Sequence, residues 1–207
     1  MVRIGVTGPM ASGKSTVARR FQERGAELID GDALGWDVLR LPEVISEIGA
    51  AFGPGVLGRD GQVDRMRLGR LVFRDPDSMQ RLNAIVQPVL LRRVREVLDA
   101  PGGGVRVLDA AMLTTWRLEP GLDGVVEVET SPAERSRRLR SARGFTEGEA
   151  RERIQGQSLP PVRSARRLWR IENDGDKADL IRRADRIWEE IAGLPDTGSG
   201  EESTAGA

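Results

Sequence analysis

The chain has 207 residues, of which 39% are hydrophobic and 31% are charged, and its formal net charge is zero. We therefore expect a globular protein with no long-range attraction for nucleic acid or for a membrane surface. Cysteine and histidine are absent, which excludes disulfides, thiolate metal sites, histidine-based hydrolase triads and most zinc sites.

The chain begins with a predicted strand, a helix and a second strand. The apolar run at 3–8, RIGVTG, ends in glycine and predicts a buried strand. Residues 13–26 carry apolar side chains on one helical face. Residues 26–30, AELID, predict a second strand that ends in an acid.

A mainly helical segment follows. Residues 32–53 have a helical pattern that Pro42 interrupts, and a turn-rich piece then leads to a further pattern at 65–73. After a break at Pro76, residues 77–100 predict one long helix.

The second half alternates again. Strands are predicted at 104–110, 123–130 and 168–174, and helices at 131–143, 146–157 and 176–193. Ser131 is expected to cap one helix, and Thr146 and Glu149 have the spacing of a capping box. Strands that alternate with helices predict an α/β fold, in which helices cover both faces of a parallel sheet.

Residues 8–16, GPMASGKST, satisfy the Walker A pattern GxxxxGK[ST] between a predicted strand and a predicted helix. Such a loop wraps phosphate oxygens in backbone N–H groups, and Gly8 and Gly13 allow the close approach that this needs. The following helix directs its positive end at the phosphates, and the hydroxyl of Ser15 is expected to bind Mg²⁺.

Lys14 is one of only two lysines in a chain with thirty arginines. A compact ammonium on a flexible stem can reach the β- and γ-phosphates, whereas a planar guanidinium prefers a different geometry. The retained lysine therefore indicates a phosphate-binding role.

Acids follow two of the predicted strands, where α/β proteins bind their ligands. Asp30 and Asp32 follow the second strand, and Asp32 is a candidate general base or magnesium-positioning residue. The alternative for both acids is a helix N-cap. Asp109 ends the third strand in a Walker B-like run, VRVLDA, and is a candidate for orienting the water shell of Mg²⁺.

Residues 131–170 hold eleven arginines against four glutamates. Most are expected to form a solvated helical face. Arg138, Arg140 and Arg143 are candidates for a lid that closes on the γ-phosphate. Aromatic side chains do not alternate with these arginines, so a nucleic-acid surface is not favoured.

Taken together, these motifs resemble the dephospho-coenzyme A kinase family over nearly all of residues 2–192. The resemblance is carried by the opening GVTGPMASGKSTVARRFQERGAELIDGDAL, by DRMRLGRLVFRDPDSMQRLNAIVQPVL, and by ERIQGQ and IENDG. It implies transfer of the γ-phosphate of ATP, with Mg²⁺, to the ribose 3′-hydroxyl of dephospho-coenzyme A. By position Asp32 matches the general base of that family, and the implied ATP-binding residues are Gly8, Ala11, Ser12, Gly13, Lys14, Ser15 and Thr16.

The resemblance also implies a P-loop fold of three layers around a parallel five-stranded sheet, in one kinase domain at 1–194. Its parts are a core at 1–30, 104–130 and 165–194, a helical substrate-binding insertion at 31–103 and a lid at 131–164. The polar composition of residues 195–207 separately predicts a disordered tail.

The sequence departs from the family pattern on the acceptor and lid sides. Gln87-Pro88 stands where the family has His-Pro, and Thr115 ends an element where the family has Glu. Two alternatives therefore stay open: another small-molecule or nucleoside monophosphate kinase, and a nucleotide-binding relative with little catalysis. We expect a small-molecule acceptor, no nucleic-acid or membrane partner, a cytoplasmic location and a monomer, with an oligomer left open.

Overall fold

The computed structural model describes residues 1–72, 74–157 and 159–195, apart from the side chain of Arg143. The chain forms two compact units. One contains Met1–Asp30 together with the chain from Pro101 onward, and the other is Gly31–Ala100. Of the tail predicted at 195–207, all but Pro195 lies outside the described residues.

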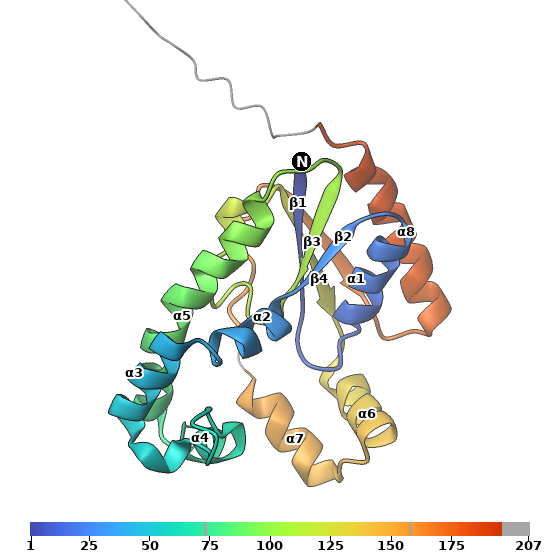
Figure 1. Cartoon of the computed structure of the whole chain (residues 1–207). Helices are drawn as coiled ribbons and strands as arrows, with labels where there is room; N and C mark the ends of the chain where they lie inside the picture. Colours follow the sequence, from blue (N-terminus) through green and yellow to red (C-terminus); the bar gives the residue numbers. More distant parts are fainter. Residues whose placement is uncertain (73, 158, 196–207) are drawn as a thin grey trace, which may run out of the picture. The chain divides into compact units, whose positions relative to one another are not determined.

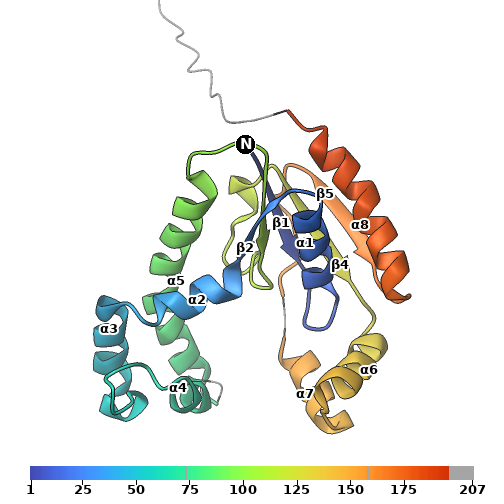
Figure 2. The ribbon, with the colours of Figure 1, turned by 45° about the vertical axis from the view of Figure 1, so that its right-hand side comes forward.

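The first unit is built on a parallel sheet of five strands (Figures 1 and 2). The strands are β1 (Val2–Thr7), β2 (Glu27–Asp30), β3 (Val105–Asp109), β4 (Gly124–Glu129) and β5 (Leu168–Glu172), in the spatial order β2-β3-β1-β4-β5. All four neighbouring pairs are parallel, which confirms the predicted sheet. The carboxyl ends of the strands therefore share one edge, and the loop after β1 begins there.

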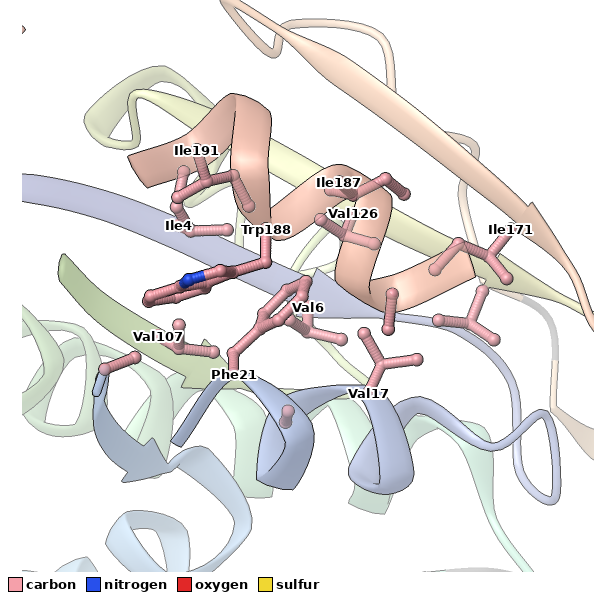
Figure 3. Close-up of a cluster of buried hydrophobic side chains, with 14 of the residues drawn as sticks. Ile4, Val6, Val17, Phe21, Val107, Val126, Ile171, Ile187, Trp188 and Ile191 are labelled. Carbon is pink, nitrogen blue, oxygen red and sulfur yellow. The ribbon is translucent and has the colours of Figure 1, made fainter. Parts of the chain in front are cut away.

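Two helices, α1 (Lys14–Glu23) and α8 (Lys177–Ala192), lie side by side on one face of this sheet (Figure 1). Each is amphipathic: α1 buries Val17 and Phe21, and α8 buries Trp188 and Ile191. Figure 3 shows these side chains in one cluster with those of the strands. The first helix after the phosphate loop is thereby fixed against the sheet.

Phe21 is expected to make one of the larger contributions to this core. Its side chain is fully buried, and its ring centroid lies 5.6 Å from that of Trp188 in a tilted arrangement. We expect Phe21→Ala to lower the free energy of unfolding by about 3–5 kcal/mol in urea denaturation. Met66→Ala, at a side chain 73% exposed, should change it by less than about 0.5 kcal/mol. Equal effects of the two substitutions would contradict this assignment of the core.

The other face of the sheet is covered in part by the segment between β3 and β4, which contains the short helix η2 (Glu119–Gly121). Leu113 and Leu122 from this segment are fully buried. A Cβ atom on Gly5 of β1 would lie 2.4 Å from Leu113 Cδ1, so the segment packs directly on the strand. Thr114 of this segment lines a cavity together with Thr7 and Gly8, at the carboxyl end of β1.

Helices α6 (Pro132–Arg143) and α7 (Glu147–Gly156) follow β4 and lie side by side (Figures 1 and 2). Ser131 caps α6 by accepting from the Glu134 amide. Thr146 and Glu149 form the capping box of α7. Both predicted caps are confirmed.

The second unit is helical. It contains α2 (Gly31–Val38), α3 (Pro42–Phe52), the short η1 (Pro54–Val56), α4 (Arg65–Val72) and α5 (Pro76–Asp99). Helices α2, α3 and α4 all contact α5. The predicted breaks at Pro42 and Pro76 are both helix starts. Pro42 is the first residue of α3, and Pro76 is the first residue of α5, which Asp75 caps. Among the described helices, none combines the length and the apolar character that a membrane span requires.

Candidate phosphate-binding site

The loop between β1 and α1 has the backbone of a phosphate cradle. Gly8, Ala11 and Gly13 have positive φ angles of 151°, 64° and 99°. A Cβ on Gly8 would lie 2.3 Å from the Val128 carbonyl oxygen, and one on Gly13 would lie 2.4 Å from Asn173 Nδ2. Glycine is therefore required at both positions, for torsion and for space.

Several amide groups of this loop are available to a ligand. Ser12 N donates to the Pro9 carbonyl at 3.0 Å, and Thr16 N donates to the Gly13 carbonyl at 2.9 Å. In the described part of the chain, the amides of Ala11, Gly13, Lys14 and Ser15 donate to no carbonyl oxygen outside the helix. Such a group of N–H donors at the positive end of a helix binds anions.

Three donors hold the Ser12 carbonyl group. Asn173 Nδ2 donates to it at 2.6 Å, Thr130 Oγ1 at 3.0 Å, and Arg138 Nη1 at 3.2 Å. In a trans peptide the C=O and the following N–H point in opposite directions. These bonds therefore turn the Gly13 N–H away from the neighbours that bind the carbonyl, and preorganise the loop.

Lys14 lies at the start of α1, and its Nζ is 2.6 Å from Asp109 Oδ1 at the end of β3. The two side chains are only 14% and 13% exposed. The ammonium group has three N–H donors, so this bond leaves donors for phosphate oxygens. Two residues that were predicted separately, 95 positions apart, are thus in direct contact.

The same edge carries the oxygen donors that Mg²⁺ prefers. Ser15 Oγ lies 3.5 Å from Lys14 Nζ, and Asp30 is the register partner of Asp109 on the adjacent strand. The described residues include no group of three or more acidic side chains that could hold a metal by themselves. The hydroxyl of Ser15 and the carboxylate of Asp109 fit a magnesium ion that would take its further ligands from phosphate and water.

One arginine of α6, Arg138, contacts the loop from the side. Its guanidinium donates to the carbonyls of Ala11 at 3.3 Å and Asn173 at 2.7 Å, and its Nε donates to Glu134 at 2.8 Å. Arg140, the second candidate, is exposed, and the structure shows no hydrogen bond from its described side chain. The side chain of Arg143 lies outside the described part of the chain.

Glu134 supports a prediction about acid stability. Hydrogen bonds from Arg137, and then from Arg138, lower the pKa of this carboxyl from 4.5 to about 2, although partial burial opposes them. A carboxyl with a lowered pKa stabilises the fold above its unfolded pKa, and this contribution is lost as the pH falls through the folded value. The stability difference between wild type and Glu134→Gln should be constant near neutral pH and shrink between pH 4.5 and about 2.

Unfolding free energies measured across this pH range test the prediction. The exposed Glu152 of α7 supplies the control substitution Glu152→Gln. If the Glu134→Gln difference persists unchanged down to a pH of about 2, the ion pairs of Glu134 do not stabilise the folded state.

Two cavities flank the phosphate loop within the first unit. One, of about 460 Å³, is lined by Ala11, Gly13, Thr16, Arg138 and the residues Gly175–Lys177 among others. The second, of about 310 Å³, is lined by Thr7, Gly8, Pro9, Thr114, Glu127, Arg135, Gln157 and Leu159–Pro161. Residues of the loop thus contribute to the lining of both cavities.

Asp32 lies in the second unit, as an exposed residue in the first turn of α2. The helix begins one residue earlier, at Gly31, so Asp32 does not have the N-cap position. Chain connectivity alone keeps its Cα within about 8 Å of that of Asp30, the last residue of β2. The proposed catalytic role of Asp32 stays a prediction.

Four residues that hold the loop were not among the predicted site residues: Thr130, Arg135, Gln157 and Asn173. Thr130 and Asn173 directly follow β4 and β5, and Asp109 has a similar strand-end position as the last residue of β3. A search for polar residues after every strand would have found them. Gln157 is the last residue of ERIQGQ, one of the elements that carry the family resemblance. Arg135 had no such signal, because a charge count does not distinguish one arginine of a helix from another.

The sequence was compared with known protein families. The family model described as dephospho-CoA kinase matches residues 2–179. A dephospho-CoA kinase of Thermobifida fusca is 37% identical over 193 residues, which is 92% of this chain and 96% of that protein. The dephospho-CoA kinase of Streptomyces avermitilis is 38% identical, over 92% of this chain and 94% of that protein.

The fold was compared with solved structures. TT1252 from Thermus thermophilus is similar with a TM-score of 0.75 and 30% identity, over 93% of this chain and 98% of that chain. The dephospho-CoA kinase from Campylobacter jejuni has a TM-score of 0.58 at 18% identity, over 92% of this chain and 97% of that chain. A shikimate kinase from Bacteroides thetaiotaomicron has a TM-score of 0.52 at 19% identity, over 92% of this chain and 98% of that chain. The predicted P-loop kinase fold is confirmed, and this chain belongs to the dephospho-CoA kinase family.

Proposed function

We propose that this chain transfers the γ-phosphoryl group of ATP to the ribose 3′-hydroxyl of dephospho-coenzyme A, the last step of coenzyme A biosynthesis. The observation that carries the proposal is the preorganised loop at 8–16, with Lys14 beside Asp109, in a chain of the dephospho-CoA kinase family. Phosphoryl transfer needs positioned charge more than covalent chemistry from the protein. The loop supplies that charge.

The donor nucleotide is assigned to the loop and to the larger cavity beside it. The amides of Ala11, Gly13, Lys14 and Ser15 would bind the phosphates, together with the side chain of Lys14. Ala11 and Gly13 of the loop also line the cavity of about 460 Å³. This cavity would therefore receive the nucleoside part of the ATP molecule whose phosphates the loop binds. Arg138, which lines it, is the lid candidate that these contacts support.

Magnesium is part of this proposal. Ser15 would hold the ion through its hydroxyl, and Asp109 would hold the water shell of the ion. The bound ion would neutralise charge on the β- and γ-phosphate oxygens. The residues of the chain then orient the phosphates, while the carboxylate of Asp109 also holds the ammonium of Lys14 in place.

The acceptor side is assigned from the family resemblance. Asp32 would accept the proton of the attacking 3′-hydroxyl, since it follows the strand whose last residue pairs with Asp109. The insertion at 31–103 would bind the acceptor, and the segment at 131–164 would act as the lid. We also propose that the enzyme acts as a cytoplasmic monomer on a small-molecule acceptor.

An acceptor screen tests the function. Purified protein is incubated with Mg-ATP and with dephospho-coenzyme A, adenosine, AMP or shikimate, and ADP release is measured by a coupled assay. We expect turnover with dephospho-coenzyme A, with the added phosphate on the 3′-position of the product by NMR. Turnover only with another acceptor would refute the proposal, and ATP binding without turnover on any acceptor would favour a binding protein.

A further inference from the structure

Arg135 of α6 is a buried arginine in contact with the phosphate loop. The residue is only 7% exposed. Its Nε donates to the Met10 carbonyl at 2.8 Å, and its Nη2 donates to Gln157 Oε1 at 3.3 Å. Met10 N also donates to Gln157 Oε1, at 2.6 Å. Arg135, Met10 and Gln157 thus form a closed ring that joins α6, the end of α7 and the loop.

Both partners of the Arg135 guanidinium are neutral. In the described part of the chain no carboxylate forms an ion pair with it, and burial lowers its pKa. The neighbouring Arg137 and Arg138 differ, because each is paired with Glu134. Burying an unpaired cation costs free energy, so a carboxylate would be the favourable partner if the role were only structural.

The charge of Arg135 borders the smaller cavity. Arg135 and Gln157 line it together with Gly8 and Pro9 of the loop. Glu127, the acid in this lining, pairs with Arg170 Nε at 3.1 Å, and the same Nε lies 3.6 Å from Glu129. The hydroxyl of Thr114, also in the lining, is buried and has no hydrogen-bond partner among the described residues. Among the described residues, the cavity therefore presents a cation that no carboxylate pairs with, Arg135, and a hydroxyl group without a hydrogen-bond partner, that of Thr114.

We propose that Arg135 is a second cation of the phosphate-transfer site, and that Gln157 holds it through a neutral oxygen so that its charge remains available to phosphate oxygens. The inference rests on the proposed kinase function. The phosphate oxygens have two sources, the transferred phosphoryl group of ATP and the diphosphate of dephospho-coenzyme A. A guanidinium serves either, since its planar set of N–H donors matches oxyanions.

The substitution Gln157→Glu separates charge from structure. A glutamate can accept from the same two donors, Met10 N and Arg135, and charged acceptors form stronger hydrogen bonds than neutral ones. The ring should therefore persist, and thermal stability should be retained or raised. The added carboxylate would, however, cancel the charge of Arg135. A purely structural ring predicts no loss of substrate affinity in this variant, whereas a second cation predicts a loss.

The experiment measures Mg-ATP binding by calorimetry, and the KM for dephospho-coenzyme A, in wild type, Gln157→Glu and Gln155→Glu. Gln155 is exposed on the last turn of α7 and supplies the same added charge away from the ring. We expect Gln157→Glu to weaken the binding of one of the two substrates by on the order of tenfold. Gln155→Glu should change neither the affinity for Mg-ATP nor the KM for dephospho-coenzyme A by more than about twofold. The substrate that is weakened identifies the source of the phosphate oxygens.

Retained affinity for both substrates in a stably folded Gln157→Glu would overturn the inference. If this variant is less stable than wild type, Arg135→Lys and Arg135→Gln are compared instead. Substrate affinity that is kept in Arg135→Lys and lost in Arg135→Gln supports the proposed role of the positive charge. Equal affinity in the two variants refutes that role. A wild-type protein that binds no ATP would instead remove the proposed function itself.

Discussion

Replacing Lys14 by alanine is expected to lower kcat/KM for ATP by about three orders of magnitude. The ammonium group is the one cation that the loop itself supplies to the β- and γ-phosphates, and loss of a single preorganised charge or donor at the reacting group costs about 10²–10³-fold in rate. The ammonium group of Lys14 also contributes to nucleotide binding, and the loss of that contribution lowers kcat/KM for ATP further. The measurement is ADP release at saturating dephospho-coenzyme A, with ATP varied.

Lys14→Arg is the more stringent variant. It keeps the positive charge and can keep an ion pair with Asp109, now formed at 2.6 Å by the lysine. The site is narrow, however, because both side chains are less than 15% exposed, and a guanidinium is larger and planar. We expect Lys14→Arg to lose at least about tenfold in kcat/KM. Full activity would contradict the reason we give for the retained lysine.

The control for both variants is Arg19→Ala. Arg19 is exposed on the same helix and has no place in the proposed site, so its substitution should leave kcat/KM within about twofold. Thermal unfolding of all three variants separates loss of chemistry from loss of fold, because Lys14→Ala also leaves Asp109 without its ammonium partner. A Lys14→Ala protein that is folded and fully active would end the kinase proposal.

Most of the core could be predicted from sequence because local signals agreed with the fold. Strands such as 3–8 are short apolar runs, and the helix after the loop carries Val17 and Phe21 at helical spacing. These signals depend only on neighbours in the chain. The same is true of the Thr146 and Glu149 box, since a cap is a contact over three residues.

The phosphate loop was predictable for a different reason. Gly8, Gly13 and Lys14 are each the one residue type that the local geometry accepts, so their spacing identifies the loop without any tertiary information. Lys14 and Asp109 are far apart in the sequence. They come into contact because β3 is the neighbour of β1 in the sheet. Asp109 is the last residue of β3, and Lys14 follows the loop that leaves the end of β1.

The arginine contacts around the loop could not be predicted. Arg135 and Arg138 lie three residues apart on one helix, yet the first is buried against neutral oxygens and the second is paired with Glu134. Which arginine of α6 reaches the loop depends on how the helix is rotated after β4, and that rotation is set by tertiary packing. A local excess of arginine contains no information about it.

Asp32→Asn is expected to lower kcat by about 10²–10⁴-fold while changing the KM for ATP little, because a positioned general base contributes that much to proton transfer. The substitution keeps the size of the side chain and removes its ability to accept a proton. The rate is measured at saturating ATP and dephospho-coenzyme A. The control is Asp37→Asn, at an exposed residue of the same helix that pairs with Arg40 at 3.5 Å on the surface, and we expect its kcat to stay within about twofold.

A structural role for Asp32 makes a different prediction. If its carboxylate only favours the start of α2 through the helix dipole, the loss should appear as a small fall in stability, and kcat should be nearly unchanged. A fall in kcat without a fall in thermal stability therefore supports the base. If kcat in Asp32→Asn stays within about threefold of wild type, the proton of the 3′-hydroxyl must leave to another acceptor, and the family assignment of this residue does not hold for this chain.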